Sequence, residues 1–162
     1  MTFDNIQTTI YQIRSIIKNN ASVRKLIYYD IDDPLSQADV PVSQIEDCIF
    51  LSPVFDTAVA PYDKTTFITI SISKLRETDD QIYIGVVRVN ILSQLNLWPI
   101  ANNKIRVLEL VNQINSTLNN QKFASSNKLT FDQIELVVLD KNISGYSMVF
   151  DLTEGSGLEN EF

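Results

Sequence analysis

The chain has 162 residues, of which 44% are hydrophobic, and 20 acidic against 13 basic side chains give a net charge of -7. This length and apolar content suit one folded domain with a real core. The negative charge disfavours a generic nucleic-acid-binding surface, and the complete lack of histidine removes the usual acid–base group and the commonest transition-metal ligand.

Helical periodicity dominates the first 28 residues. Isoleucines at spacings of four, three and four predict an amphipathic helix over Thr2–Asn19. A shorter helix is expected over Val23–Tyr28, with Ser22 as its N-cap and with Leu26 and Ile27 turned inward. The isoleucines of the first helix are Ile6, Ile10, Ile13 and Ile17.

The segment Asp30–Pro61 has no helical periodicity. Four prolines fall in it, and Ile45–Leu51 is the only stretch that resembles a strand. We therefore expect a short strand between long loops, and loops of this length are often functional or mobile.

An antiparallel hairpin is predicted in the middle of the chain. From Thr66, isoleucines alternate with threonine and serine, which is typical of a strand with one buried face. Glu77–Gln81 supplies turn residues, and Ile82–Leu92 returns as a strand that is apolar on both faces. Such a strand is expected to be central in the sheet or to meet another subunit.

A second helix and a second hairpin complete the pattern. Asn102 or Asn103 is the expected N-cap of a helix that the polar stretch Asn119–Lys128 ends. The strands Ile134–Asp140 and Tyr146–Thr153 are expected to pair across the turn Lys141–Gly145. The apolar face of this second helix comprises Val107, Val111, Ile114 and Leu118, and that of the last strand comprises Tyr146, Met148, Phe150 and Leu152.

Together these elements predict an α+β fold. Two hairpins form a mostly antiparallel sheet, and two long amphipathic helices pack on one face of it as a two-layer sandwich. Residues 1–154 are expected to form a single domain, and residues 155–162 a flexible acidic tail.

Several functional classes lack their usual signatures in this sequence. The single cysteine, Cys48, cannot form an internal disulfide, and its apolar neighbours indicate a packed core thiol. The four glycines match no dinucleotide or phosphate loop, and no GxSxG elbow occurs. With neither a signal peptide nor a membrane-spanning run, the protein is expected in a cytoplasm-like compartment, without a membrane partner.

The densest carboxylate cluster comprises Asp30, Asp32 and Asp33. Three close carboxylates could bind Mg²⁺ or Ca²⁺, which prefer oxygen ligands. The cluster lacks the glycine and glutamate positions of an EF-hand, and the sequence Asp32-Asp33-Pro34 is typical of a solvated turn. A solvated turn is therefore favoured, and no catalytic, cofactor or metal site is predicted.

Basic and aromatic residues gather around the first hairpin. A surface that stacks single-stranded nucleic acid is conceivable there, but neighbouring acids oppose phosphate, so cross-strand ion pairs are favoured. The adjacent tyrosines Tyr28 and Tyr29, and Trp98, are either core edges or interface anchors. The residues of the basic and aromatic group are Lys64, Lys74, Arg76, Arg88, Tyr62, Phe67 and Tyr83.

The segment LVVLDKNISGYSMVFDLTE at 136–154 resembles the closing hairpin of bacteriophage tail terminator (tail completion) proteins. The order of the upstream elements is also similar: an N-terminal helix, RKLIYYDIDDPL at 24–35, a hairpin, and a helix before the last two strands. The resemblance covers most of the chain in element order and offers no motif from which contacts could be assigned.

This resemblance implies a virion structural protein, made in the host cytoplasm and placed at the tail–neck junction, with no enzymatic activity. Such proteins form a homo-oligomeric ring, typically a hexamer, that caps the tail tube and meets neck or head-completion proteins, and in some tails the sheath. DNA would pass through the ring without specific binding. The alternatives are a head–tail connector or stopper subunit, a metal-dependent enzyme that uses Asp30, Asp32 and Asp33, and a small-molecule-binding module.

Overall fold

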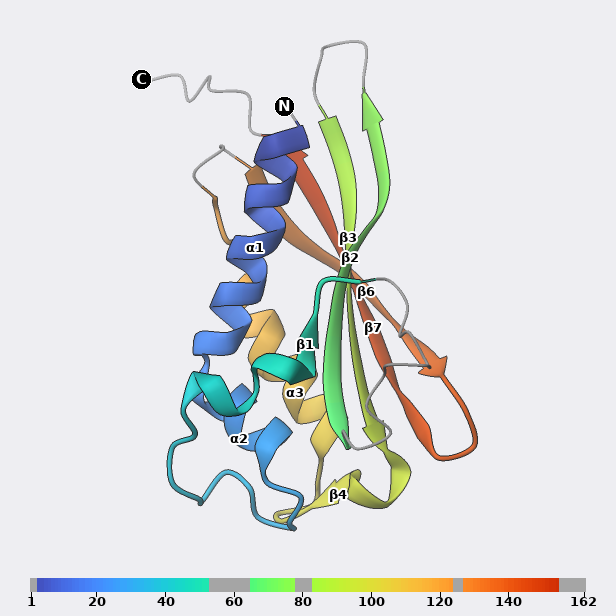
Figure 1. Cartoon of the computed structure of the whole chain (residues 1–162). Helices are drawn as coiled ribbons and strands as arrows, with labels where there is room; N and C mark the ends of the chain where they lie inside the picture. The colour runs from blue at the N-terminus through green and yellow to red at the C-terminus, as the bar shows by residue number, and fades with distance from the viewer. Residues whose placement is uncertain (1–2, 53–64, 78–82, 124–126, 155–162) are drawn as a thin grey trace.

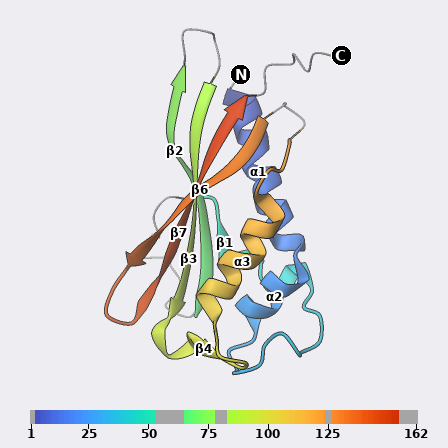
Figure 2. The same cartoon turned by 180° about the vertical axis from the view of Figure 1, so that it is seen from behind.

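The computed structural model of the protein describes residues 3–52, 65–77, 83–123 and 127–154. Within these ranges, the helices α1 (Phe3–Asn19), α2 (Ala21–Tyr28) and α3 (Arg106–Leu118) lie on one face of a five-stranded sheet (Figures 1 and 2). The predicted two-layer α+β fold is thereby confirmed. The predicted tail, 155–162, lies outside the described residues.

The sheet contains both predicted hairpins. Its strands follow the order β1-β2-β3-β7-β6, so the strand that was expected to be apolar on both faces, β3, is central. Every neighbouring pair is antiparallel except β1–β2. The strands are β1 (Ile49–Phe50), β2 (Thr66–Glu77), β3 (Tyr83–Gln94), β6 (Asn127–Val138) and β7 (Ile143–Glu154), and β4 (Pro99–Ile100) pairs with β5 (Lys104–Ile105) as a separate ribbon.

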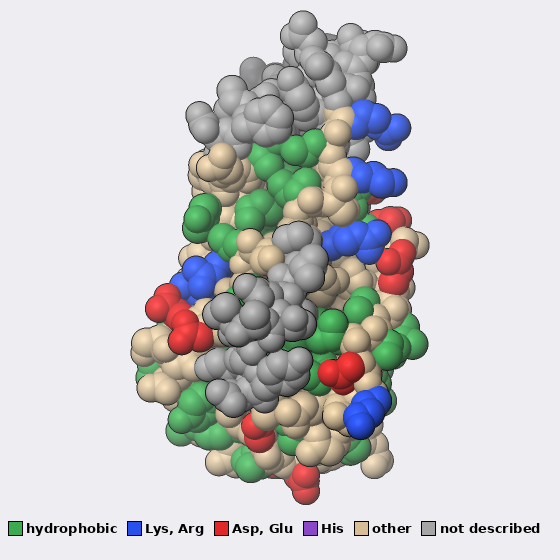
Figure 3. Space-filling model, turned by 45° about the vertical axis from the view of Figure 1, so that its right-hand side comes forward, with side chains coloured by type: hydrophobic (Ala, Val, Ile, Leu, Met, Phe, Trp, Pro, Cys, Tyr) green, Lys and Arg blue, Asp and Glu red, His purple; other side chains and the backbone are tan. Residues whose placement is uncertain are grey.

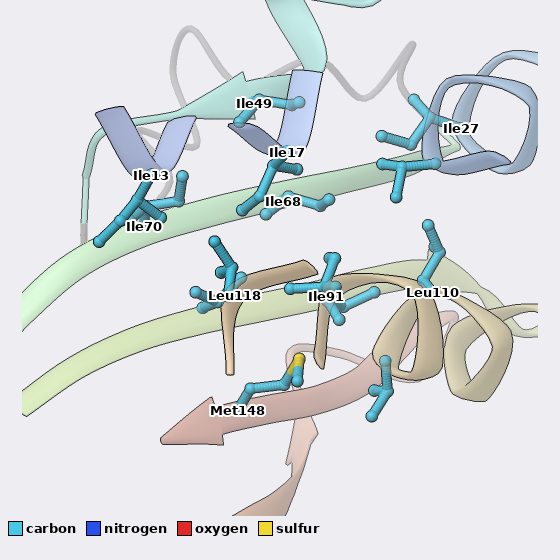
Figure 4. Close-up of a cluster of buried hydrophobic side chains, with 14 of the residues drawn as sticks. Ile13, Ile17, Ile27, Ile49, Ile68, Ile70, Ile91, Leu110, Leu118 and Met148 are labelled. Atoms are coloured by element: carbon cyan, nitrogen blue, oxygen red, sulfur yellow. The ribbon is translucent and has the colours of Figure 1, made fainter. Parts of the chain in front are cut away.

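The core lies between the helices and the sheet. Figure 4 shows isoleucines of α1 and β2 facing one another, with leucines of α3 set against Ile91 and Met148 from the central and neighbouring strands. The predicted apolar faces of α1 and α3 are confirmed, although Ile10 is only partly buried. No helix in the described ranges has the length and apolar character needed to cross a bilayer.

The N-cap of α2 is Asn20, whereas the sequence predicted Ser22. Asn20 Oδ1 accepts a hydrogen bond of 3.1 Å from the Val23 N–H, and Asn20 Nδ2 donates to Thr117 Oγ1 on α3 at 3.1 Å. Asn20 is the single residue between α1 and α2, and Ser22 lies inside α2. Because Asn20 serves both as the cap and as a link to α3, it fixes the corner between the two N-terminal helices.

The prediction that Asn102 or Asn103 caps α3 was wrong. Both asparagines have positive φ, 62° and 57°, and form the turn between β4 and β5. Asparagine tolerates this left-handed conformation, so the pair serves the turn instead of the helix. Helix α3 begins at Arg106, after Ile105, which supplies no side-chain cap.

Ile45–Leu51 forms far less strand than predicted. Two 3₁₀ turns, Val42–Gln44 and Glu46–Cys48, precede the two-residue strand β1. Ile45 and Cys48 are both buried, and a spacing of three places two side chains on one side of a 3₁₀ turn. The expected packed thiol is confirmed at Cys48, which is 7% exposed.

Strand β2 departs from the simple alternation expected of it. Residues 66–70 are all buried, so this end of the strand is covered on both faces. On the face away from the helices, Thr69 Oγ1 accepts a hydrogen bond of 2.9 Å from Asn90 Nδ2, which satisfies its polar group. A β-bulge between Ile72 and Lys74 then shifts the register.

The second hairpin is longer than predicted and depends on one glycine. Its strands have twelve residues each, and β7 pairs with β3 on its other side. A Cβ atom at Gly145 would lie 1.8 Å from the carbonyl oxygen of Ile91. Only glycine allows β3 and β7 to approach this closely at that point.

Candidate functional site

A stripe of exposed aliphatic side chains follows the second half of β6. Ile134, Leu136 and Val138 are 40%, 63% and 66% exposed, and Leu139 beside them is 44% exposed. We call these four residues the β6 stripe. Soluble monomers rarely gather several large apolar side chains along one exposed strand, so the stripe is the first candidate for a contact surface.

Three members of the β6 stripe, Ile134, Leu136 and Val138, lie on the helix side of the sheet but beyond the helices. Ile134 and Leu136 are register partners of Met148 and Tyr146, and paired residues share a face. Met148 is fully buried against the core, whereas exposure rises along β6 toward its C-terminal end. In Figures 1 and 2 this hairpin runs diagonally away from the three helices.

The backbone edge of β6 is open in the same half. Its first half is bridged to the segment after α3: Asn120 N–H donates to the Leu129 carbonyl at 2.8 Å, and Phe131 N–H donates to Asn119 Oδ1 at 2.9 Å. Among the described residues, residues 133–138 pair only with β7. An apolar stripe and unpaired backbone groups therefore coincide.

The turn of this hairpin is built to hold its shape. Asp140 Oδ1 accepts hydrogen bonds from the N–H groups of Asn142 and Ile143 at 2.6 and 2.9 Å. The Asn142 carbonyl in turn accepts a bond of 2.8 Å from Leu95 N–H, which ties the turn to the segment after β3. A shallow hollow lies between these two segments, and Leu95 at 43% exposure extends the apolar area.

Among the residues that the structure describes, the opposite edge of the sheet is also open over part of its length. Strand β1 pairs with β2 only at Ile68 and Thr69. In the later part of β2, Leu75 is 39% exposed, and Lys74 and Arg76 are exposed. Figure 3 shows basic side chains along one upper margin of the molecule and hydrophobic side chains lower on the same side.

A buried arginine, which sequence reasoning missed, organises the other end of the molecule. Arg106 is fully buried, and its guanidinium donates to the carbonyls of Leu26, Tyr29, Ile31 and Leu97. It thereby satisfies carbonyls at the C-terminal end of α2, where a positive charge also suits the helix dipole. Burial lowers the pKa of Arg106, while the nearby carboxylates of Asp30 and Asp32 act to raise it.

The predicted carboxylate cluster takes part in this structural network. Asp30 accepts a hydrogen bond of 2.7 Å from the Thr65 hydroxyl, and the Asp32 carbonyl accepts from Ala101 N–H. Asp33 is exposed, and its carbonyl accepts from Ser36 and Gln37 within the turn. The residues that the structure describes contain no group of three histidine, cysteine or acidic side chains that could hold a metal ion.

Of the predicted basic group, Lys74, Arg76 and Arg88 lie on the outer face of the adjacent strands β2 and β3. Arg88 forms an ion pair of 2.8 Å with Glu135 on β6, whereas the charge-pair interpretation had placed its partners among the acids of the first hairpin. Lys74 and Arg76 are exposed on β2, whereas Phe67 is buried. Lys64 and Tyr62 lie outside the described residues. The side chain of Tyr83 lies outside the described part as well.

The tyrosine pair and Trp98 have different surroundings. Tyr28 is 47% exposed and meets Tyr29 edge to face with ring centroids 5.0 Å apart. Trp98 packs on the core, 6.2 Å from the Tyr146 ring, and its indole N–H donates to the Ser93 carbonyl. Trp98 is thus a core edge, and Tyr28 remains a candidate contact residue.

The fold and this surface define a small α+β protein with a partly open sheet edge that is lined by aliphatic side chains. The chain belongs to the YomW family, which it matches over residues 20–152. The family is phage-associated. The match covers α2, α3 and all the described strands except the last two residues of β7, and no curated protein matches the chain.

Proposed function

We propose that this phage-associated protein is a virion structural subunit of the tail terminator kind. It forms a closed homo-oligomeric ring, a hexamer in the proteins it resembles, on the head-proximal end of the tail tube. The ring ends tube growth and offers a docking surface to neck or head-completion proteins, and to the sheath where the tail has one. The role is one of assembly, not catalysis.

The observation that carries the proposal is the β6 stripe on an open strand edge. Ile134, Leu136 and Val138 are about half exposed, so burying them in a contact would contribute about 1 kcal/mol each. The unpaired backbone groups of the same strand favour addition of a further strand. A ring subunit needs such adhesive surfaces, because each copy must bind two neighbours.

The charge of the chain supports a ring that DNA crosses without sticking. The subunit has a net charge of -7, and repeating it around a ring multiplies this negative charge. Carboxylates near the channel would repel phosphate and keep the passage free of specific DNA contacts.

Light scattering and binding to purified tail tubes test this function. We expect the wild-type protein to have the mass of a ring, alone or on tubes, and electron microscopy to place it at one end of each tube. Intact virion tails, whose ends are already capped, are the control and should bind no added protein. Binding to isolated neck complexes but not to free tubes would favour the connector or stopper alternative, and a strict monomer that ignores free tubes at high concentration would overturn the proposal.

A further inference from the structure

We infer that the ring contact is a head-to-tail strand pairing, in which the second half of β6 in one copy adds to the second half of β2 in the next. This inference rests on the proposed function and names its interface. The partner is a second copy of this chain, and the joined sheets continue from subunit to subunit.

The strand directions allow this pairing. Three successive antiparallel pairs, β2–β3, β3–β7 and β7–β6, make β6 antiparallel to β2. A copy placed beyond β6 in the same orientation therefore presents its β2 antiparallel to β6. The contact joins two different surfaces, as a ring requires and as a two-fold dimer does not.

The unpaired backbone groups on the two edges also match. Leu139 N–H donates to the Ile143 carbonyl at 3.1 Å, and alternation along β6 then turns the backbone groups of Leu136 and Val138 away from β7. Gln94 N–H donates to the Thr65 carbonyl at 2.9 Å. The same alternation along β2 turns the backbone N–H and carbonyl of Ile72 away from β3. Within the described ranges, both edges therefore offer donors and acceptors without a strand partner at alternate residues.

The side-chain faces agree with this backbone pattern. Residues directly paired across two strands share a face of the sheet. Leu136 and Val138 point to the helix side, and so does Ile72, whose register partner is the buried core residue Val87. Pairing of the two edges therefore brings apolar side chains together on the helix side. If the outward-pointing backbone groups of β2 belonged to residues on the other face, the same pairing would place apolar side chains of β6 beside polar side chains of β2.

The side chains that would meet are complementary. On the helix side, Ile134, Leu136 and Val138 would be joined by Ile72 and the exposed Leu75 of the next copy. In charge, residues 132–140 contain three acids and no base, whereas residues 70–76 contain two bases and no acid. Glu135, at 45% exposure despite its ion pair with Arg88, and Lys74 point to the same outer face. Attraction across the contact would thus reinforce apolar burial.

Because the open segments of β2 and β6 lie at opposite ends of the sheet, pairing them would shift each copy along the strand direction relative to its neighbour. As far as the described residues extend, the open segment on both edges is the C-terminal half of its strand, and the two strands run in opposite directions. Pairing the two halves therefore staggers neighbouring subunits. Closing a sheet into a barrel needs such a stagger, so the geometry favours closure around a channel.

Two edge variants test the pairing. Leu136→Pro removes an N–H that points away from β7, so the hairpin keeps its own hydrogen bonds while its outer edge is blocked. Lys74→Glu combined with Arg76→Glu reverses the charge of the β2 edge without touching the core. Tyr11→Asp, at a residue of α1 that is 62% exposed, is the control for loss of exposed apolar surface. Thermal melting by circular dichroism checks that each variant is folded.

The oligomer masses of the variants test whether β6 of one copy pairs with β2 of the next. We expect wild type and Tyr11→Asp to form the ring, and each edge variant alone to have the mass of one 18.4 kDa chain. A 1:1 mixture of the two edge variants retains one intact β6–β2 pair, so it should give a species of twice that mass and nothing larger. Rings formed by either edge variant, or a dimer of one variant alone, would overturn the pairing while leaving the ring function intact. A wild-type protein that never assembles would instead overturn the proposed function.

Discussion

The guanidinium of Arg106, the first residue of α3, donates a hydrogen bond of 2.9 Å to the carbonyl oxygen of Tyr29, the residue that follows α2. Two residues 77 positions apart in sequence are thus joined inside the protein. Three further carbonyls share the same side chain, so Arg106 fastens the end of the helical layer and its following loop to α3.

Removal of this arginine is expected to be among the most damaging single changes. Arg106→Ala leaves several buried carbonyls without a donor, and we expect a loss of about 3–5 kcal/mol in the free energy of unfolding. Arg106→Lys keeps the charge but not the fork of donors, so it should recover only part of this stability. Urea denaturation measures both.

Arg88→Ala is the control for the Arg106 variants, because its ion pair with Glu135 is partly exposed. Such a pair contributes about 0.5 kcal/mol. If Arg88→Ala proved as destabilising as Arg106→Ala, the carbonyl network would not be the source of the effect.

Gly145→Ala tests the close approach of β3 and β7. The added methyl group would lie 1.8 Å from the Ile91 carbonyl oxygen, so the two strands must separate. We expect a loss of about 3 kcal/mol, at the upper end of overpacking penalties, measured by thermal or urea unfolding. Gly85→Ala is the matched variant on β3, where the nearest atom is a leucine side-chain carbon at 3.2 Å. Equal losses at the two glycines would contradict the backbone contact.

The N-cap of α2 can be assigned by two alanine substitutions. Asn20→Ala removes both the cap bond to Val23 and the link to Thr117, so we expect a loss of about 1–2 kcal/mol. Ser22→Ala, at the residue that the sequence favoured as cap, should change stability by less than about 0.5 kcal/mol. A larger loss of stability for Ser22→Ala than for Asn20→Ala in urea unfolding would instead identify Ser22 as the cap.

Glu46 should give part of the pH dependence of stability. Its hydrogen bond and ion pair with Lys18, 2.8 Å long, lower the pKa of Glu46 from its ordinary value of 4.5. A carboxyl whose pKa is lower in the folded state stabilises the fold above pH 4.5, and this contribution disappears as the pH falls through the lowered value. Lys18→Met should therefore raise the Glu46 pKa in an NMR titration and flatten the unfolding free energy between neutral and acid pH. Lys25→Met, which removes a different ion pair, should leave the Glu46 pKa unchanged.

Much of the fold could be predicted because its apolar periods are strong and local. The four-three-four spacing from Val107 to Leu118 and the alternation from Tyr146 to Leu152 each describe one buried face, and both faces are buried as expected, with Tyr146 partly so. The central position of β3 followed from its unusually apolar character. These patterns depend on neighbours a few residues away, which is why they are visible in a single sequence.

The failures have longer-range causes. Arg106 stands in the sequence as an ordinary charged residue before an apolar run, and nothing near it reveals the carbonyls that its burial requires. Asn102 has the residue type of a helix cap, but it lies in the β4–β5 turn with a positive φ. Likewise, the alternating side chains Ile134, Leu136 and Val138 indicate a strand, but whether a helix covers them depends on how far α3 extends over the sheet.

The neighbour order of the sheet also constrains how the chain can fold during synthesis. Strand β3 is central only because β7, which begins at Ile143, pairs with it after α3 and β6 have been made. Until then the apolar β3 is a bare edge, and the N-terminal helices have an incomplete surface to pack on. Folding must therefore await the last part of the chain, and a ribosome that stalls before β7 would release a product prone to aggregation.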